Sequence, residues 1–163
     1  MIMMMKRIAI AAVACGLAAP AFAQNNLRDE VTATVAGKAV AIEYGRPSLK
    51  GRDMLAQADI GKPWRMGADA ATSLKTEADL TFGAVSVPKG EYILKATKVA
   101  DNQWQLNVLS KADNSKVADI PLTASKLDTN LETFTIDLKG DKEKGEFSMA
   151  WGSTALKASF TGK

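Results

Sequence analysis

The feature that most constrains the fold is an alternation of apolar and polar residues with a period of two. Phe134, Ile136 and Leu138 alternate with polar neighbours, and the pattern recurs in Val40–Tyr44, Trp104–Val108, Phe147–Trp151 and Leu156–Phe160. Because successive side chains of a strand point to opposite faces, each segment has one apolar face and one polar face. The pattern predicts antiparallel sheets around a shared core, not a parallel sheet buried on both sides.

Short turn sequences separate these runs. They are Ala36-Gly37, Pro88-Lys89-Gly90, Asp101-Asn102, Gly140 to Gly145 and Gly152-Ser153, the last joining the final two strands as a tight hairpin. Leu80–Val87 and Glu91–Val99 flank the second of them as two further strands. Turns at this spacing are typical of β-sandwiches and barrels. We therefore predict an all-β fold, an antiparallel β-sandwich or sandwich-like barrel of about eight or nine strands.

Helical signals after the N-terminal region are short. Asp53–Asp59 is expected to form at most one or two turns, with Asp53 as the N-cap and Gly61 as the stop.

The N-terminus predicts a signal peptide at residues 1–23. Lys6 and Arg7 precede an apolar stretch over residues 8–19, and Ala21-Phe22-Ala23 supplies the small-residue cleavage site. The apolar stretch is shorter than the roughly 20 residues of a transmembrane helix. Cleavage after Ala23 is favoured over lipid attachment at Cys15, because the apolar stretch before Cys15 is short and a complete cleavage site follows it.

The predicted mature chain, residues 24–163, has the usual size of a single domain. We expect it in the periplasm or outside the cell, with no membrane span once the signal peptide is removed. Loss of Lys6 and Arg7 lowers the formal charge from +3 to +1. A general affinity for nucleic acid or for a membrane surface therefore has no support from charge.

The absence of histidine excludes many kinds of site. The chain has no His, and its one Cys lies in the predicted signal peptide. Ser-His-Asp and Cys-His catalysis, Cys/His zinc sites, and the usual ligand sets of haem and blue copper are therefore unavailable. Glycine-rich phosphate loops and calcium loops are also missing. We expect no metal and no cofactor, so any catalysis would use carboxylates, Lys, Arg, Tyr or hydroxyls.

One long segment, residues 45–72, has no clear hydrophobic period, and it is rich in Gly, Pro and cationic residues. Long irregular segments in compact domains are usually functional or poorly ordered. Arg forks suit carboxylate and phosphate, so this loop could hold an anionic ligand. Its cations could equally cap carbonyls or pair with Asp53, Asp59 and Asp69. The candidate ligand-binding residues are Arg46, Ser48, Lys50, Arg52, Trp64, Arg65, Asp69 and Thr72.

Two details of this segment have alternative interpretations. Ser48 and Lys50 have the spacing of a catalytic dyad, although the same spacing is common in solvated turns. Trp64 is either a flat surface for a ligand or a plug that anchors the loop on the sandwich. Trp104 and Trp151 are in phase with apolar neighbours, so we expect both in the core.

Two blocks of this segment resemble a known family. Residues 44–52, Tyr-Gly-Arg-Pro-Ser-Leu-Lys-Gly-Arg, and residues 61–72, with Lys-Pro-Trp-Arg-Met-Gly, are similar to domain-of-unknown-function family 2911. The resemblance continues through Val87 to Tyr92 and spans roughly residues 35 to 160. It implies an exported bacterial β-sandwich and assigns no activity. Met66, Asp69 and Ala70 depart from the family pattern, which has Thr, Asn and Glu there. A catalytic Glu at the last of these positions would be missing in this chain.

Three functional hypotheses follow. The leading one is a non-catalytic binding module whose 45–72 loop holds a small anionic or saccharide-like ligand, or a partner surface. The second is a cofactor-free hydrolase or isomerase in which Tyr44, Lys50 and Asp69 converge in one pocket. The third is an assembly protein that pairs through a long exposed sheet edge.

Overall fold

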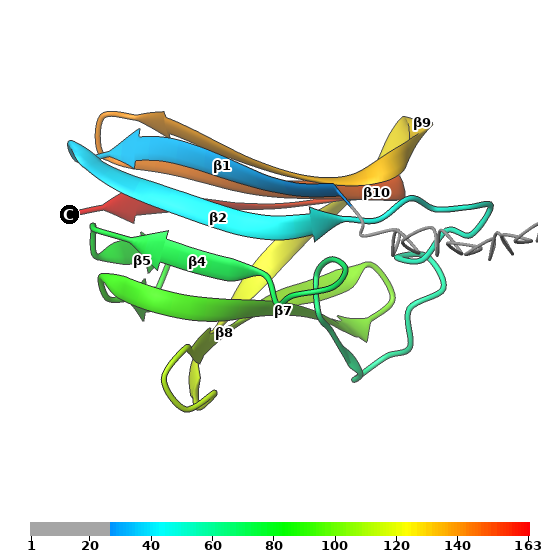
Figure 1. Ribbon diagram of the computed structural model, residues 1–163, viewed down its shortest axis with the longest axis horizontal. Helices are drawn as coiled ribbons and strands as arrows, with labels where there is room; N and C mark the ends of the chain where they lie inside the picture. The colour runs from blue at the N-terminus through cyan, green and yellow to red at the C-terminus, as the bar shows by residue number, and fades with distance from the viewer. Residues whose placement is uncertain (1–26) are drawn as a thin grey trace, which may run out of the picture.

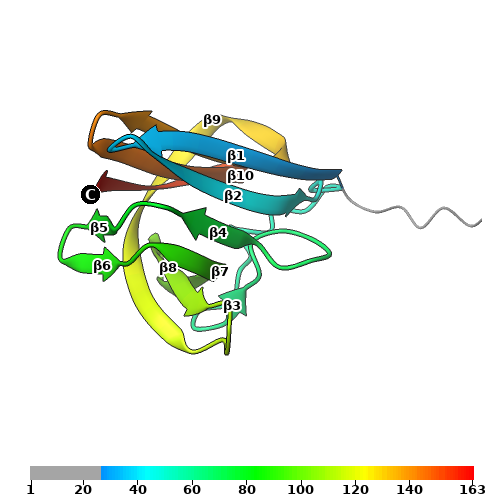
Figure 2. The ribbon, with the colours of Figure 1, turned by 60° about the vertical axis from the view of Figure 1, so that its left-hand side comes forward.

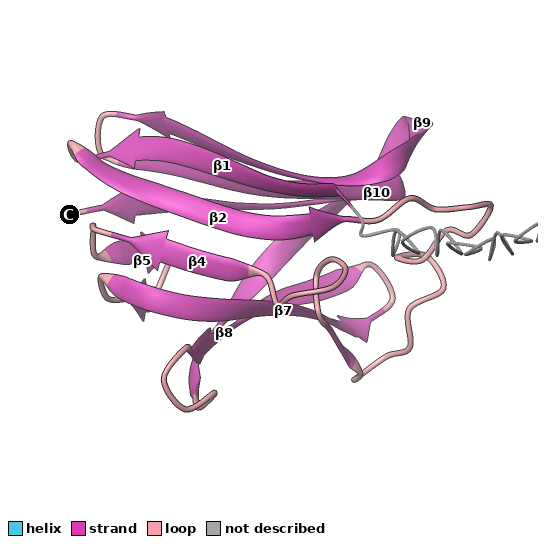
Figure 3. Ribbon diagram, in the orientation of Figure 1, coloured by secondary structure: helices cyan, strands magenta, loops and turns pink. Residues whose placement is uncertain are grey.

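The computed structural model describes residues 27–163, and these residues form strands, turns and loops without a helix (Figure 3). The predicted signal peptide lies outside the described residues. The all-β prediction is confirmed. The fold has ten strands in place of about eight or nine, and three of them have only two or three residues. No described helix is long and apolar enough to cross a membrane.

The strands follow one another with short connections, except on either side of the third strand, where residues 47–62 and 65–72 form longer loops. Their bounds are β1 (Leu27–Val35), β2 (Lys38–Arg46), β3 (Pro63–Trp64), β4 (Ser73–Thr76), β5 (Leu80–Phe82), β6 (Val85–Val87), β7 (Gly90–Ala100), β8 (Gln103–Ser110), β9 (Lys116–Asp141) and β10 (Lys144–Gly162).

All strand pairs are antiparallel, in the order β1-β2-β4-β7-β8-β9-β10-β5-β6, with β3 added to β7. This single sheet folds over into two layers. Figures 1 and 2 show β1, β2, β10 and the second half of β9 in one layer, and β4, β7 and β8 in the other. The first half of β9 passes between the layers and pairs with β8, whereas its second half pairs with the start of β10. The result is a sandwich-like fold that does not close into a barrel.

Alternating side chains fill the space between the layers. Phe134, Ile136 and Leu138 are buried, as are Trp104 and Trp151, so the core positions predicted from the period of two are confirmed. The core-facing row of β7 is Tyr92, Leu94 and Ala96, and that of the first half of β9 is Ala118, Ile120, Leu122 and Ala124. Each row continues beyond its last apolar residue with a lysine, Lys98 on β7 and Lys126 on β9.

The last strand reverses direction near Gly152, which has φ +60°. The N–H of Gly162 donates to the carbonyl of Glu143 at 2.7 Å, so the two ends of β10 lie together. Figure 1 shows β10 running out along the sandwich and returning to the side of the C-terminus. A Cβ at Gly152 would lie 2.5 Å from an Asp53 carboxylate oxygen. The absence of a side chain at this reversal therefore leaves room for Asp53 of the 45–72 segment.

Two local predictions need correction or refinement. Leu80–Val87 is not one strand but two, β5 and β6, because Gly83 at φ +61° reverses the chain between them. Asp53–Asp59 makes a single turn, in which Gln57 N–H donates to the Asp53 carbonyl at 3.1 Å. Asp53 caps this turn as expected, since its carboxylate accepts a bond from Ala56 N–H at 3.3 Å.

A buried tyrosine joins β2 to the edge of β9. The Tyr44 hydroxyl accepts a hydrogen bond from Ile136 N–H at 2.9 Å and donates one to the Ile136 carbonyl at 3.3 Å. It thus replaces the strand neighbour that these two backbone groups lack. Burial is the largest influence on the Tyr44 phenol and raises its pKa, although the Ile136 bond and Arg46 act in the opposite direction. The phenol therefore remains protonated and able to donate.

Replacing Tyr44 with Phe is expected to lower the free energy of unfolding by about 1–3 kcal/mol, because it leaves both Ile136 backbone groups buried without a partner. Chemical denaturation measures the loss. Tyr92→Phe is the matched control, since the Tyr92 hydroxyl serves only the Pro88 carbonyl at 2.5 Å. Equal losses in the two variants would contradict the role given to Tyr44.

Candidate functional site

The first family-like block continues β2 along the open edge of β9. Phe134 N–H donates to the Pro47 carbonyl at 2.9 Å, and Leu49 N–H donates to the Glu132 carbonyl at 2.9 Å. Ser48 forms an antiparallel bridge with Thr133 between these two bonds. Lys50 N–H donates to the Glu132 carboxylate at 3.1 Å. The backbone of this block is therefore fixed by β9.

The side chain of Arg46 makes its contacts where this block meets β9. Its Nε donates to the Phe134 carbonyl at 3.2 Å, and one Nη donates to the Thr135 hydroxyl at 3.0 Å. Its other Nη pairs with the Asp29 carboxylate at 3.4 Å. The side chain is 24% exposed, so the guanidinium ties β1, β2 and β9 together. The structure places Arg46 as a linker of strands, and it lines neither cleft described below.

The two family-like blocks meet at a pair of glycines. A Cβ on Gly45 would overlap the carbonyl oxygen of Ala68, and a Cβ on Gly67 would lie 2.7 Å from the Gly45 carbonyl oxygen. Gly67 also has φ +140°, which disfavours any other residue. The backbones of residues 45 and 67–68 therefore touch directly, and side chains are excluded from this contact.

Thr72 closes the second block. Its buried hydroxyl donates to the Met66 carbonyl at 2.5 Å, and its own carbonyl accepts a bond from Leu94 N–H at 2.9 Å. Met66 is fully buried with φ +56°. Thr72 is thus part of the loop's internal framework, and its hydroxyl is already engaged.

Trp64 anchors the loop on the core. Its ring stacks on Trp151 at 5.7 Å and 18°, and it meets the Phe134 ring edge-on at 5.0 Å. Trp151 in turn donates from its indole nitrogen to the Glu132 carbonyl at 3.0 Å. Such ring pairs add to the energy of burial. Of the two interpretations of Trp64, the geometry matches the plug.

Asp53 fastens the middle of the loop to β10. Its carboxylate accepts bonds from the Ser153 hydroxyl at 2.5 Å and the Ser153 N–H at 3.2 Å. Burial is the largest single influence on its pKa and acts to raise it. The bonds from Ser153 and Ala56 together outweigh burial and lower the pKa of Asp53. The carboxylate is therefore held in its charged form.

The remaining candidates from the sequence face solvent. Ser48, Lys50, Arg52, Arg65 and Asp69 are all exposed, and none lines either cleft described below. Lys50 and Asp69 have left-handed φ values of +49° and +63°. Tyr44 is buried with its hydroxyl engaged by Ile136, so it does not share a pocket with Lys50 and Asp69. A binding role for the exposed residues stays a prediction.

A polar cleft of about 460 Å³ opens at the loop end of the sandwich. Figure 3 shows the longest loops gathered at this end. Leu55 and Ala56 of the loop form one wall of the cleft, and Trp104 contributes apolar surface. The other lining residues come from the end of β7, the turn between β7 and β8, and the middle parts of β9 and β10, namely Lys98, Asp101, Asn102, Ala124, Ser125, Lys126, Ser153 and Thr154.

Polar residues continue the core-facing rows into this cleft. Lys98 follows Ala96 by two positions on β7, and it pairs in register with Trp104 on β8. Lys126 follows Ala124 by two positions on β9, and it pairs in register with Thr154 on β10. The strands therefore replace apolar residues with cations and hydroxyls at the same end of the molecule. Polar groups in such positions suit a ligand better than a core.

The sequence interpretation missed these residues, although one signal was present. Lys98 stands in an inward phase, after Tyr92, Leu94 and Ala96, where an apolar residue is expected. A register shift between Lys98 and Ala100 marks a β-bulge, a feature common beside functional sites. Nothing local to Lys126 or Thr154 indicated that the fold would bring them beside Lys98.

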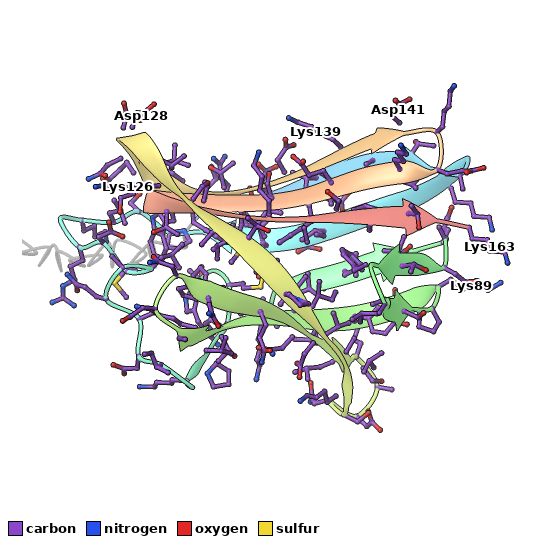
Figure 4. All side chains as sticks on the ribbon, turned by 180° about the vertical axis from the view of Figure 1, so that it is seen from behind. Lys89, Lys126, Asp128, Lys139, Asp141 and Lys163 are labelled. Atoms are coloured by element: carbon purple, nitrogen blue, oxygen red, sulfur yellow. The ribbon has the colours of Figure 1, made fainter. Side chains whose placement is uncertain are left out.

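A second groove, of about 570 Å³, lies at the opposite end, over β5, β9 and β10. Its lining includes Lys139, Asp141 and three glycines, Gly83, Gly140 and Gly145. Figure 4 shows Asp141 toward this end, Lys126 at the other end and Lys139 between them. Among residues 27–163, no group of three or more His, Cys, Asp or Glu side chains is placed to hold a metal ion.

These features define an antiparallel β-sandwich protein with a tightly anchored loop and a polar cleft beside it. Residues 27–160 match the family model described as protein of unknown function (DUF2911), and the chain belongs to that family. The resemblance expected from the two blocks is confirmed. No curated protein and no solved structure matches the chain.

Replacing Gly45 with Ala is expected to lower the free energy of unfolding by about 2–3 kcal/mol, because the new methyl group overlaps a fixed backbone carbonyl. Thermal and chemical denaturation measure the loss. Gly51→Ala is the control, since a Cβ there meets open space and only the left-handed φ of +81° costs stability, about 1 kcal/mol. A Gly45 variant no less stable than the Gly51 variant would overturn the contact between blocks.

Replacing Asp53 with Asn is expected to remove a pH-dependent contribution to stability. A carboxylate whose folded pKa is lowered stabilises the fold above its unfolded pKa, about 3.9, and that contribution is lost as pH falls through the folded value. The stability gap between the wild type and the variant should therefore be largest near neutral pH and shrink below about pH 4. Urea denaturation across pH measures it. Asp59→Asn, a change at an exposed pair with Lys62, is the control.

Proposed function

We propose that this protein is an exported, non-catalytic binding module that holds a small anionic or saccharide-like ligand in the cleft at its loop end. The observation that carries the proposal is the convergence of Lys98, Lys126, Asn102 and Thr154 on one cleft of about 460 Å³. Small-molecule sites commonly have volumes of about 300–1,000 Å³. Two cations, one carboxylate, an amide and several hydroxyls suit a ligand of that chemistry.

The anchored loop supports this proposal. Asp53, Trp64 and the Gly45–Gly67 contact hold the loop at several points along its length, so Leu55 and Ala56 form a fixed wall. Trp104, which is 5% exposed, adds a small area of apolar surface to the lining. A preformed wall lowers the ordering cost of binding. In this proposal the family-like blocks hold the wall of the site in place, and residues of β7, β9, β10 and the β7–β8 turn contact the ligand.

Assembly through strand pairing is not proposed. The two terminal strands of the sheet are β1 and β6. β6 has three residues, and β1 lies against β9, where a Cβ on Gly140 would overlap the Thr34 carbonyl oxygen. The turns that follow β1 and β9 are joined by a hydrogen bond from Ala36 N–H to the Lys142 carbonyl at 2.6 Å. Strand addition needs a longer free row of backbone groups.

Binding is testable by NMR titration of the protein with inorganic phosphate, citrate and trehalose. At least one probe is expected to shift the amide signals of Lys98, Asn102, Ser125 and Thr154 in a saturable way, because these residues surround the cleft. Lys98→Gln and Lys126→Gln should each weaken binding of an anionic probe at least threefold. Lys139→Gln, the same change at a lysine that lines the second groove and not this cleft, is the matched control.

Two outcomes would count against the proposal. One is the absence of saturable shifts with all three probes. The other is a set of shifts centred on Lys50, Arg52 and Arg65, which would move the site to the exposed face of the loop.

A further inference from the structure

Within the cleft, Lys98 and Asp101 form a loose ion pair. The Lys98 ammonium lies 3.7 Å from the Asp101 carboxylate, beyond the usual hydrogen-bond distance. The lysine side chain is 15% exposed, whereas the aspartate side chain is 89% exposed. Asp101 is the only acidic partner recorded for Lys98 among residues 27–163. A largely buried cation therefore depends on a solvated carboxylate.

The position of Asp101 lets it leave. It lies in the two-residue turn between β7 and β8, next to Asn102 at φ +58°. No hydrogen bond of the Asp101 side chain to another described residue is recorded. A single contact at 3.7 Å to a carboxylate that is 89% exposed contributes little to stability, because solvent screens the aspartate side of the pair. Turning the carboxylate out into solvent thus costs little, and it would leave the Lys98 ammonium facing the cleft.

We propose that Asp101 is an internal placeholder for an anionic ligand. Its carboxylate pairs with the Lys98 ammonium when no ligand is bound, and the carboxylate or phosphate of the ligand displaces it. This inference rests on the proposed function and narrows the ligand to a small anion. Lys98 supplies the main contact. Lys126, Asn102 and the hydroxyls of Ser125 and Thr154 complete the site.

The charge of the cleft agrees with this assignment. Lys98 and Lys126 face one carboxylate, Asp101, among the lining residues. When Asp101 turns away, the two lysines remain; a dianion neutralises both, and a monoanion neutralises one of them. A neutral saccharide would have no reason to displace Asp101, so its affinity would not depend on that carboxylate.

Asp101→Asn tests the proposal with inorganic phosphate as the probe, by NMR titration. The variant is expected to bind phosphate about fivefold more tightly, because the competing carboxylate is gone. In a Lys98→Gln background the same substitution should change affinity less than twofold, since the gain acts through Lys98. Asp128→Asn is the matched control. It removes the same charge near Lys126 (Figure 4), and Asp128 does not line the cleft.

The possible failures are distinguishable. If neither the wild type nor Asp101→Asn binds phosphate or citrate, the anion site is absent and the proposed function loses its anionic form. If the wild type binds phosphate but Asp101→Asn gains no affinity, the placeholder role is wrong and the cleft remains a binding site. An equal gain in Asp128→Asn would show a general charge effect and would also overturn the placeholder.

Discussion

The fold depends on the junction between residues 44–50 and the open edge of β9. A sheet that folds over into two layers leaves backbone groups at its margins, and buried groups of this kind must find partners. Here the Tyr44 hydroxyl serves Ile136, the Pro47 carbonyl serves Phe134, and Leu49 serves Glu132. Side chain and backbone therefore continue the hydrogen bonding where no regular strand is present.

This junction explains why an irregular loop can be rigid. After β2 the loop runs along β9, and Asp53 bonds it to Ser153 of β10. Further along, Trp64 stacks on Trp151, and the loop then meets its own beginning at the Gly45–Gly67 contact. Its unusual composition, rich in Gly, Arg and Pro, serves those contacts. Glycines allow two backbones to touch, and Arg46 bonds a carbonyl, a hydroxyl and a carboxylate at once. The residues of the two family-like blocks thus do not line the cleft themselves; they hold in place the loop whose Leu55 and Ala56 form its wall.

The sequence was a reliable guide to some elements and a poor one to others, for physical reasons. The strands with Phe134 or Trp104 could be predicted because a half-buried strand imposes a period of two on its own residues. Leu80–Val87 resembles one strand because apolar residues occur along its whole length, but Val85 and Val87 are out of phase with Leu80 and Phe82 across the turn at Gly83. The charge of Arg46 and the position of Trp64 in an irregular segment suggest a ligand-binding surface. Their partners are residues of β1, β9 and β10, which no local pattern could reveal.

The sequence by itself determined the class of fold, the buried positions, the turns and the exclusion of chemistry that needs His. Each of these depends on the identity of a residue and its near neighbours along the chain. Only the tertiary structure decided which cations are engaged and which face open space. It also brought Lys98, Asp101, Lys126 and Thr154 together from three strands and a turn. Such a meeting is set by strand order and register, because residues far apart in sequence become neighbours only when the sheet folds over.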